Sequence, residues 1–181
     1  MLKKTSILVI LFCAIALAGC KKNPKEQIQG QVPNVVEQDS LMPRYSSYCN
    51  GRYGFCINYP TAIFFPQGES DSGDGQIFLS EDKCNELRVY RDSRTIVNNG
   101  GFSLQEAYNE DINENLTGRK VKDNRLSDES YFVTGIDSNG NLFYQKSILS
   151  GNEFVTAILS YQPGTEQQYE DLIVPIFSSL K

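Results

Sequence analysis

The sequence contains no histidine and no tryptophan among its 181 residues. Histidine is the side chain that most often serves as the general base beside a nucleophile, and it is the commonest metal ligand. Its absence excludes histidine-dependent catalytic triads and histidine-containing zinc sites. The chain also lacks a nucleophile elbow and a glycine-rich phosphate loop. We therefore expect a protein that is not an enzyme and that needs no cofactor.

Positive charge is also scarce. Lys and Arg number 17 against 22 Asp and Glu, which gives a formal net charge of -5. Nucleic acids and anionic lipid surfaces both attract basic faces. An acidic body therefore predicts that the chain does not bind nucleic acid.

A long apolar run occurs only at the start of the chain. Lys3 and Lys4 precede the apolar segment from Ile7 to Leu17, which ends in Leu17-Ala18-Gly19-Cys20. The run is too short for a membrane span, which needs about 20 apolar residues. A basic start, a short apolar stretch and small residues before a cysteine indicate a secretion signal.

Leu17-Ala18-Gly19-Cys20 resembles the lipobox of bacterial lipoproteins. The resemblance implies that the Cys20 thiol receives a diacylglyceryl group, that the chain is cut before Cys20, and that the new terminus is acylated. The implied location is the cell envelope, with the protein held on a membrane through its lipid. In proteobacterial lipoproteins, an aspartate directly after the lipidated cysteine is typical of retention in the inner membrane. This chain has Lys21 at that position, so the resemblance favours the periplasmic side of the outer membrane over the inner membrane.

The lipobox resemblance and the composition together predict three parts of the chain. We expect a lipoprotein signal peptide at residues 1–19, the lipidated Cys20 with a flexible tether at residues 20–44, and a domain at residues 45–181. The tether is polar, contains three prolines and shows no helical or strand period. Removing residues 1–19 takes away two lysines and no carboxylate, so the formal charge falls to about -7.

Within the domain, alternating patterns predict strands and two helices. A first hairpin turns at Asn50-Gly51, and a second turns at residues 81–83. Ser103 with Glu106 and Thr165 with Gln168 each match a capping box, and Pro175 should kink or end the final helix. The predicted strands cover 46–49, 53–60, 76–80, 86–91, 119–123, 131–136, 142–149 and 153–161.

The last predicted strand is apolar on both faces. Phe154 and Ile158 fall on one side, while Val155, Ala157, Leu159 and Tyr161 fall on the other. Both faces of its sheet must then be covered. The predicted fold class is α+β: an antiparallel β-sheet of about six to eight strands flanked by helices, with the last four strands forming a meander.

These segments resemble a known family. From about Tyr45 to its end, the chain is similar to the PsbP-like, Mog-type α-β-α sandwich, which includes photosystem accessory proteins, a Ran-binding protein and many bacterial envelope lipoproteins. The similarity rests on residues 48–60, with Tyr53-Gly54-Phe55 and Tyr59-Pro60, on 78–90, and on 131–135 leading to 143–146. The resemblance implies an accessory, assembly or binding role without catalysis.

Three cysteines remain in the mature domain, and an exported location favours a disulfide between two of them. Cys49 and Cys56 flank the first hairpin, and Cys84 lies in the second hairpin turn. We expect a Cys49–Cys84 bridge if the two hairpins are neighbours, with Cys49–Cys56 as the alternative. These spacings differ from the Cys-x-x-Cys of redox enzymes.

The loop from Gly68 to Gly75 carries three carboxylates, those of Glu69, Asp71 and Asp74. Calcium takes oxygen ligands from such loops, although this spacing does not fit the EF-hand template. A solvated connection whose glycines permit turns is the competing interpretation. We therefore expect no cofactor, with a calcium ion as the alternative.

Together these features predict a lipid-anchored, non-catalytic cell-envelope protein that binds an unknown envelope protein or small ligand. One alternative is an envelope enzyme that uses carboxylates or tyrosines, which the missing histidine disfavours. A second alternative is a calcium-dependent binding module.

Overall fold

The computed structural model describes residues 43–95, 103–150 and 153–181. The predicted signal segment 1–19, the lipidation site Cys20 and the tether as far as residue 42 lie outside the described residues. Within the described ranges, no helix is long and apolar enough to cross a membrane.

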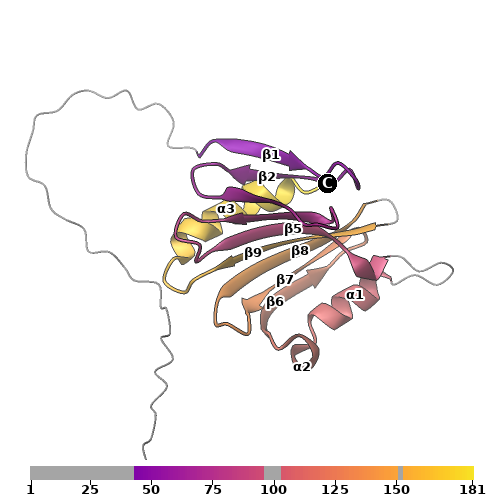
Figure 1. The fold of residues 1–181 in the computed structure, drawn as a ribbon. Coiled ribbons are helices and arrows are strands. Elements are labelled where there is room, and N and C mark those ends of the chain that lie inside the picture. The colour runs from indigo at the N-terminus through magenta and orange to yellow at the C-terminus, as the bar shows by residue number, and fades with distance from the viewer. Residues whose placement is uncertain (1–42, 96–102, 151–152) are drawn as a thin grey trace, which may run out of the picture. The chain divides into compact units, whose positions relative to one another are not determined.

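A seven-stranded antiparallel sheet forms the centre of the domain (Figure 1). Its strand order is β3-β4-β5-β9-β8-β7-β6. The strands are β3 (Phe65–Glu69), β4 (Gly75–Leu79), β5 (Glu86–Asp92), β6 (Lys120–Leu126), β7 (Ser130–Ile136), β8 (Leu142–Ser150) and β9 (Glu153–Tyr161). The predicted α+β class and the four-strand meander, β6 to β9, are confirmed.

The edge strand β3 was not predicted from the sequence. It reads Phe-Pro-Gln-Gly-Glu, and all five residues are exposed. Proline removes a ladder donor and glycine weakens a strand, so such a segment is typical of a loop or an edge. β3 forms because β4 offers it backbone partners, with an irregular register between Pro66 and Glu69.

A separate two-stranded sheet joins β1 (Tyr45–Cys49) to β2 (Cys56–Pro60). Their turn is longer than the predicted Asn50-Gly51 turn: the Asn50 side chain accepts hydrogen bonds from the backbone N–H groups of Arg52 and Tyr53, and Gly54 takes the positive φ of 77°. The free edge of β2 binds the end of the chain, because the Cys56 N–H donates to the Lys181 carbonyl at 2.9 Å.

The two faces of the large sheet are covered differently. On one face, helix α3 (Glu166–Ser178) and the β1–β2 hairpin pack over Val155, Ala157 and Leu159. On the other face, helix α1 (Leu104–Asp111) packs with Phe154, and Ile158 lies against the same cluster. The alternation along β9 thus places a helix on each face, as predicted.

Of the two capping boxes predicted from the sequence, one is present in the structure. Ser103 and Glu106 form the predicted capping box at the start of α1. The predicted box at Thr165 is wrong, because its hydroxyl donates instead to the Gln162 carbonyl at 2.6 Å and makes no cap hydrogen bond. Helix α3 continues past Pro175 to Ser178. A short helix, α2 (Glu114–Thr117), and a 3-10 turn, η1 (Ser93–Thr95), flank α1 along the chain.

A disulfide between described residues joins Cys49 to Cys56, which corrects the favoured Cys49–Cys84 pairing and agrees with the alternative. Cys49 and Cys56 face each other directly across β1 and β2, with their Cα atoms 4.1 Å apart. The neighbouring Asn50 donates to the Gly73 carbonyl, just before β4, whereas Cys84 follows the other end of β4. A five-residue strand spans about 17 Å, which is far beyond the reach of a disulfide.

Candidate functional site

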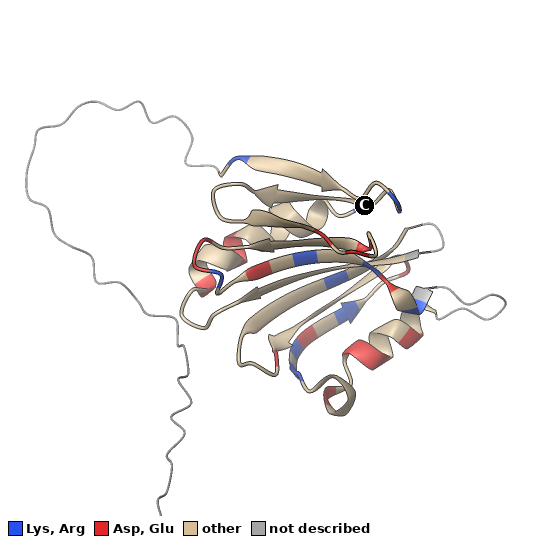
Figure 2. Cartoon of the chain, viewed as in Figure 1, with Lys and Arg blue, Asp and Glu red and all other residues tan. Residues whose placement is uncertain are grey.

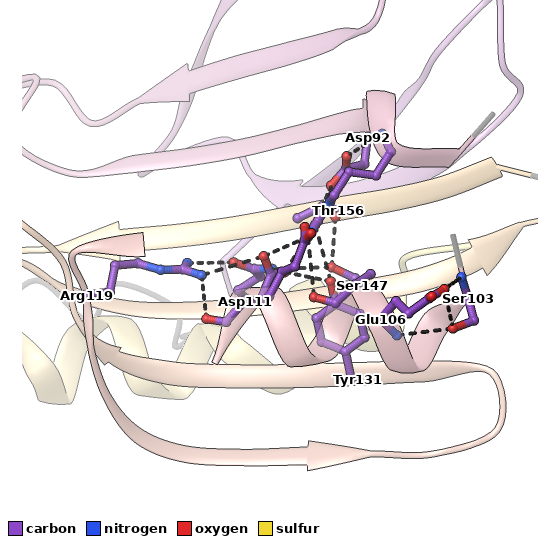
Figure 3. Close-up of polar contacts among 12 residues, drawn as sticks. Asp92, Ser103, Glu106, Asp111, Arg119, Tyr131, Ser147 and Thr156 are labelled. Carbon is purple, nitrogen blue, oxygen red and sulfur yellow. Dashed lines mark hydrogen bonds and ion pairs between the residues drawn. The ribbon is translucent and has the colours of Figure 1, made fainter. Parts of the chain in front are cut away.

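A cluster of charged and polar side chains lies between α1 and the sheet (Figure 3). Its centre is Asp111, at the last turn of α1, which is only 8% exposed. The Asp111 carboxylate accepts hydrogen bonds from the Tyr131 hydroxyl at 2.6 Å and from the Gln145 amide. Because α1 begins at a firm cap on Ser103, the helix delivers this carboxylate to a defined place on the sheet.

Arg94 holds the side of the cluster nearest β5. Its guanidinium contacts Asp111 at 3.0 Å and Asp92, at the end of β5, at 2.5 Å. Burial alone would lower the pKa of Arg94, but the hydrogen bonds to Asp92 and Asp111 outweigh it and raise that pKa. Arg94 therefore stays charged at any physiological pH and ties η1 to α1.

Arg119 holds the opposite side, just before β6. Its guanidinium donates to the Gln145 side chain at 2.7 Å and to the Asp111 carbonyl at 3.0 Å, and it lies 4.6 Å over the Phe143 ring. Its Nε is buried and has no hydrogen-bond partner within residues 43–95, 103–150 and 153–181. A buried donor without a partner costs free energy, so Arg119 is held at this position by its other contacts.

Tyr131, on β7, is 2% exposed. Burial, followed by the negative charge of Asp111 and their hydrogen bond, raises the pKa of its hydroxyl. Tyr90 lies on β5, on the same face of the sheet as Tyr131. Burial raises the pKa of its hydroxyl to about 12. Neither hydroxyl is activated as a base or nucleophile at neutral pH, since both hold their protons more firmly than a free tyrosine.

Two hollows flank the cluster on this face of the sheet. One, of about 390 Å³, is lined by Arg119, Phe143 and Asp137 among others. The second, of about 740 Å³, extends over β4 and β5 and is lined by Ile77, Tyr90 and Arg94 among others. Arg88 borders both hollows. We call this surface, formed by the two hollows and the strand residues between them, the open face.

Among the described helices, α1 lies over the other half of the sheet and leaves the open face free. Helix α1 contacts β7 and packs with Tyr131, Val133 and Phe143, whereas Ile77 on β4 remains 39% exposed. The cluster thus forms a rigid polar wall at the edge of an accessible strand surface. Apolar and aromatic residues beside fixed charges are typical of surfaces that bind a partner by shape and polar contacts.

Of the three predicted ion-binding residues, Glu69 and Asp74 line the larger hollow. Glu69 accepts a hydrogen bond from the Tyr48 hydroxyl at 2.7 Å, and Asp74 accepts one from Ser72 at 2.7 Å. Asp71 is exposed in the turn between β3 and β4. Among the residues that the structure describes, no group of three or more Cys, Asp or Glu side chains is placed to hold a metal ion.

Sequence reasoning did not identify the cluster. The signal was nevertheless present, because Asp111 falls on the same helical stripe as Leu104 and Ala107, where an apolar residue is expected. Gln145, Ser147 and Thr156 likewise occupy inward positions of strands, and all three are at most 2% exposed. A carboxylate on an apolar stripe predicts a buried partner, but the partner's identity depends on the tertiary fold.

Comparisons with known proteins identify the fold. No family model and no curated protein sequence matches the chain. Among solved structures, the chain is similar to the cyanobacterial PsbP protein CyanoP from Synechocystis sp. PCC 6803, with a TM-score of 0.54 and 14% identity over 84% of this chain and 97% of CyanoP. A protein of unknown function from Pseudomonas aeruginosa, PA94, aligns over 71% of this chain and 90% of its own length with a TM-score of 0.39 and 13% identity. The predicted PsbP-like fold is confirmed by the first similarity.

Proposed function

We propose that this chain is a lipid-anchored, non-catalytic protein of the bacterial cell envelope, whose PsbP-like domain binds an envelope protein or small ligand on its open face. The anchor would be the lipidated Cys20, on the periplasmic side of the outer membrane. The domain would be joined to it by the polar segment that ends at residue 44. No cofactor is part of this proposal.

The anchor is supported by the sequence Leu17-Ala18-Gly19-Cys20 and by the basic and apolar residues that precede it. One acyl chain binds a membrane weakly, whereas two or more bind it firmly. A domain held in this way stays close to the membrane and meets its partners at high local concentration.

The open face is the observation that carries the binding role. It combines hollows of about 390 and 740 Å³ with a wall of buried, mutually bonded charges, so its shape does not need to form during binding. Preorganised surfaces lose less entropy on association. The similarity to CyanoP supports the fold that presents this face, and the partner is left to experiment.

A non-catalytic role is supported by the chemistry of the cluster. The Asp111 carboxylate is engaged with the Arg94 guanidinium and the Tyr131 hydroxyl. The raised pKa of the Tyr131 hydroxyl makes it a poor base. The alternative of an enzyme that uses tyrosines or carboxylates has no activated group among these residues.

Membrane fractionation of wild type against Cys20→Ala tests the anchor. The wild type should sediment with the membranes, and the variant should appear in the soluble periplasmic fraction or remain unprocessed. Wild-type protein that is soluble after lysis would contradict lipid anchoring.

A photo-crosslinking amino acid at Ile77 tests the open face. Ile77 is 39% exposed there, and Leu116, on α2 and 65% exposed, provides a control at an exposed apolar position outside both hollows. A reproducible adduct from Ile77 and none from Leu116 supports the proposal. The same adducts from both positions, or none from either in intact envelopes, would count against it.

A further inference from the structure

A third hollow lies on the opposite face of the sheet, beside α3. It has a volume of about 430 Å³ and lies between α3 and the strands β6 to β8. We call it the α3 groove. Its lining includes Arg125, Phe132, Tyr144, Lys146, Val174 and Phe177.

Apolar side chains form the walls of the α3 groove. The rings of Phe132 and Tyr144 stack with centroids 5.7 Å apart, and Tyr144 contacts Phe177 at 4.5 Å. Val174, on α3, is 74% exposed at the rim. Phe132 and Tyr144 are partly buried and Phe177 is buried. A bound group would remove the exposed surface of Val174 and of the two partly buried rings from water.

The charge of the α3 groove is of one sign. Two lining residues, Arg125 and Lys146, are basic, and none is acidic. The charged residues of α3 are all acidic, whereas β6 carries three basic residues and one acidic residue, Asp123 (Figure 2). An occupant that complements this lining is apolar and carries a negative charge.

Lys146 is placed to receive that charge. Its ammonium donates one hydrogen bond, to the Phe177 carbonyl at 2.8 Å, and a lysine has three donors. Burial also lowers the pKa of Lys146, since the ammonium has lost part of its hydration. A carboxylate bound beside it would restore a charged partner.

The size and polarity of the α3 groove favour a small molecule over a polypeptide. Its volume falls within the usual range of ligand sites, about 300 to 1,000 Å³. A peptide would bring backbone N–H and C=O groups that need partners. The polar side chains here are three serines, the two cations and two tyrosines, and the Tyr131 hydroxyl is already bonded to Asp111. A hydrocarbon chain brings no such groups.

We infer that the α3 groove binds a medium-chain fatty carboxylate, with its hydrocarbon chain against Phe132, Tyr144 and Phe177 and its carboxylate on Lys146. This site is distinct from the open face and does not depend on the lipid anchor. No bond is formed or broken, so the process is reversible binding.

Calorimetric titration of the full chain carrying Cys20→Ala tests the inference, because this variant has no acyl group of its own that could compete. Sodium octanoate and sodium decanoate are the probes, and octan-1-ol is the uncharged control. We expect saturable binding that tightens from octanoate to decanoate, with octan-1-ol at least tenfold weaker than octanoate. Equal affinity for octanoate and octan-1-ol would contradict the role of Lys146.

Two variants locate the site. Lys146→Met keeps the length of the side chain and removes its charge, and it should weaken decanoate binding at least tenfold. Val174→Asp places a carboxylate at the exposed rim, where it disturbs no buried contact, and should weaken binding similarly. Lys120→Met, on β6 outside the lining, is the matched control and should bind as the parent does. Unchanged affinity in Val174→Asp would overturn the assignment even if Lys146→Met failed to fold.

A peptide probe tests whether the bound carboxylate belongs to a fatty acid or to the C-terminus of a polypeptide. A pentapeptide that ends in Leu-Phe with a free carboxylate offers the same two chemical features, and its amidated form removes the charge. Tighter binding of the free peptide than of decanoate would overturn the fatty-acid assignment in favour of a peptide C-terminus. No saturable binding of any probe in the millimolar range would overturn the inference altogether.

Discussion

Replacing Asp111 by asparagine tests whether the polar cluster holds α1 on the sheet. The substitution keeps the shape of the side chain and removes its charge. Asp111 is 8% exposed, and its carboxylate contacts Arg94 at 3.0 Å and the Tyr131 hydroxyl at 2.6 Å. Removing one partner of a buried ion pair costs about 3 to 5 kcal/mol, because the remaining charge is left without compensation.

The lower end of that range applies here. The Arg94 side chain is 22% exposed and keeps Asp92 as a second partner, so water and Asp92 relieve part of the loss. We expect Asp111→Asn to lower the free energy of unfolding by about 3 kcal/mol and the melting temperature by about 10 °C for a domain of this size.

Urea denaturation followed by circular dichroism measures the effect. Glu110→Gln is the matched control, because Glu110 precedes Asp111 on the same helix, lies 3.5 Å from Arg94 and is 40% exposed. Its loss should cost less than about 1 kcal/mol. A double-mutant cycle with Arg94→Met should show coupling above about 1 kcal/mol. The reasoning is refuted if Asp111→Asn costs no more than the control, or if the two substitutions are additive.

Three further predictions concern the disulfide, a strand glycine and alkaline pH. Replacing Cys49 and Cys56 together by serine reopens a loop with a sequence separation of 7, which should cost about 2.4 kcal/mol from loop entropy, seen as a lower urea midpoint; an unchanged midpoint would contradict this. Gly135→Ala places a Cβ 2.0 Å from the Lys120 carbonyl oxygen and should cost about 2 to 3 kcal/mol, whereas Gly51→Ala, with no atom within 4 Å, should cost almost nothing in the same assay. Tyr131 keeps its proton in the folded state, while the unfolded chain releases it near pH 10, so its contribution is present below pH 10 and is lost at about 1.4 kcal/mol per pH unit above it. Tyr131→Phe should therefore show a shallower loss of stability between pH 10 and 11, and an identical slope would count against the assignment.

The strand register could be predicted where patterning is strong. β9 alternates between Phe154 and Ile158 on the α1 face and Val155, Ala157 and Leu159 on the α3 face, and these residues enter two different core clusters. Such a strand has one stable register, because a shift by one residue would exchange the two faces. The Ser103 capping box was equally predictable, since it uses only local contacts.

Predictions failed where a residue depends on distant partners. Thr165 has the composition of a cap, but its hydroxyl binds Gln162, because the preceding turn fixes its backbone away from an extended conformation. β3 has poor strand composition and exists because β4 is next to it. The disulfide choice required the position of Cys84 relative to β4, which no spacing along the chain specifies.

The sequence by itself determined the features that depend on composition and local order. These are the missing histidine chemistry, the acidic charge, the Leu17-Ala18-Gly19-Cys20 segment, and a PsbP-like sheet whose last four strands form a meander. Only the tertiary structure decided that Asp92, Arg94, Asp111, Arg119 and Tyr131 meet in one cluster, and that α1 leaves half of its face open. The reason is physical: hydrophobic periodicity reports which side of an element is buried, whereas the partner of a buried charge is set by the packing of elements far apart along the chain.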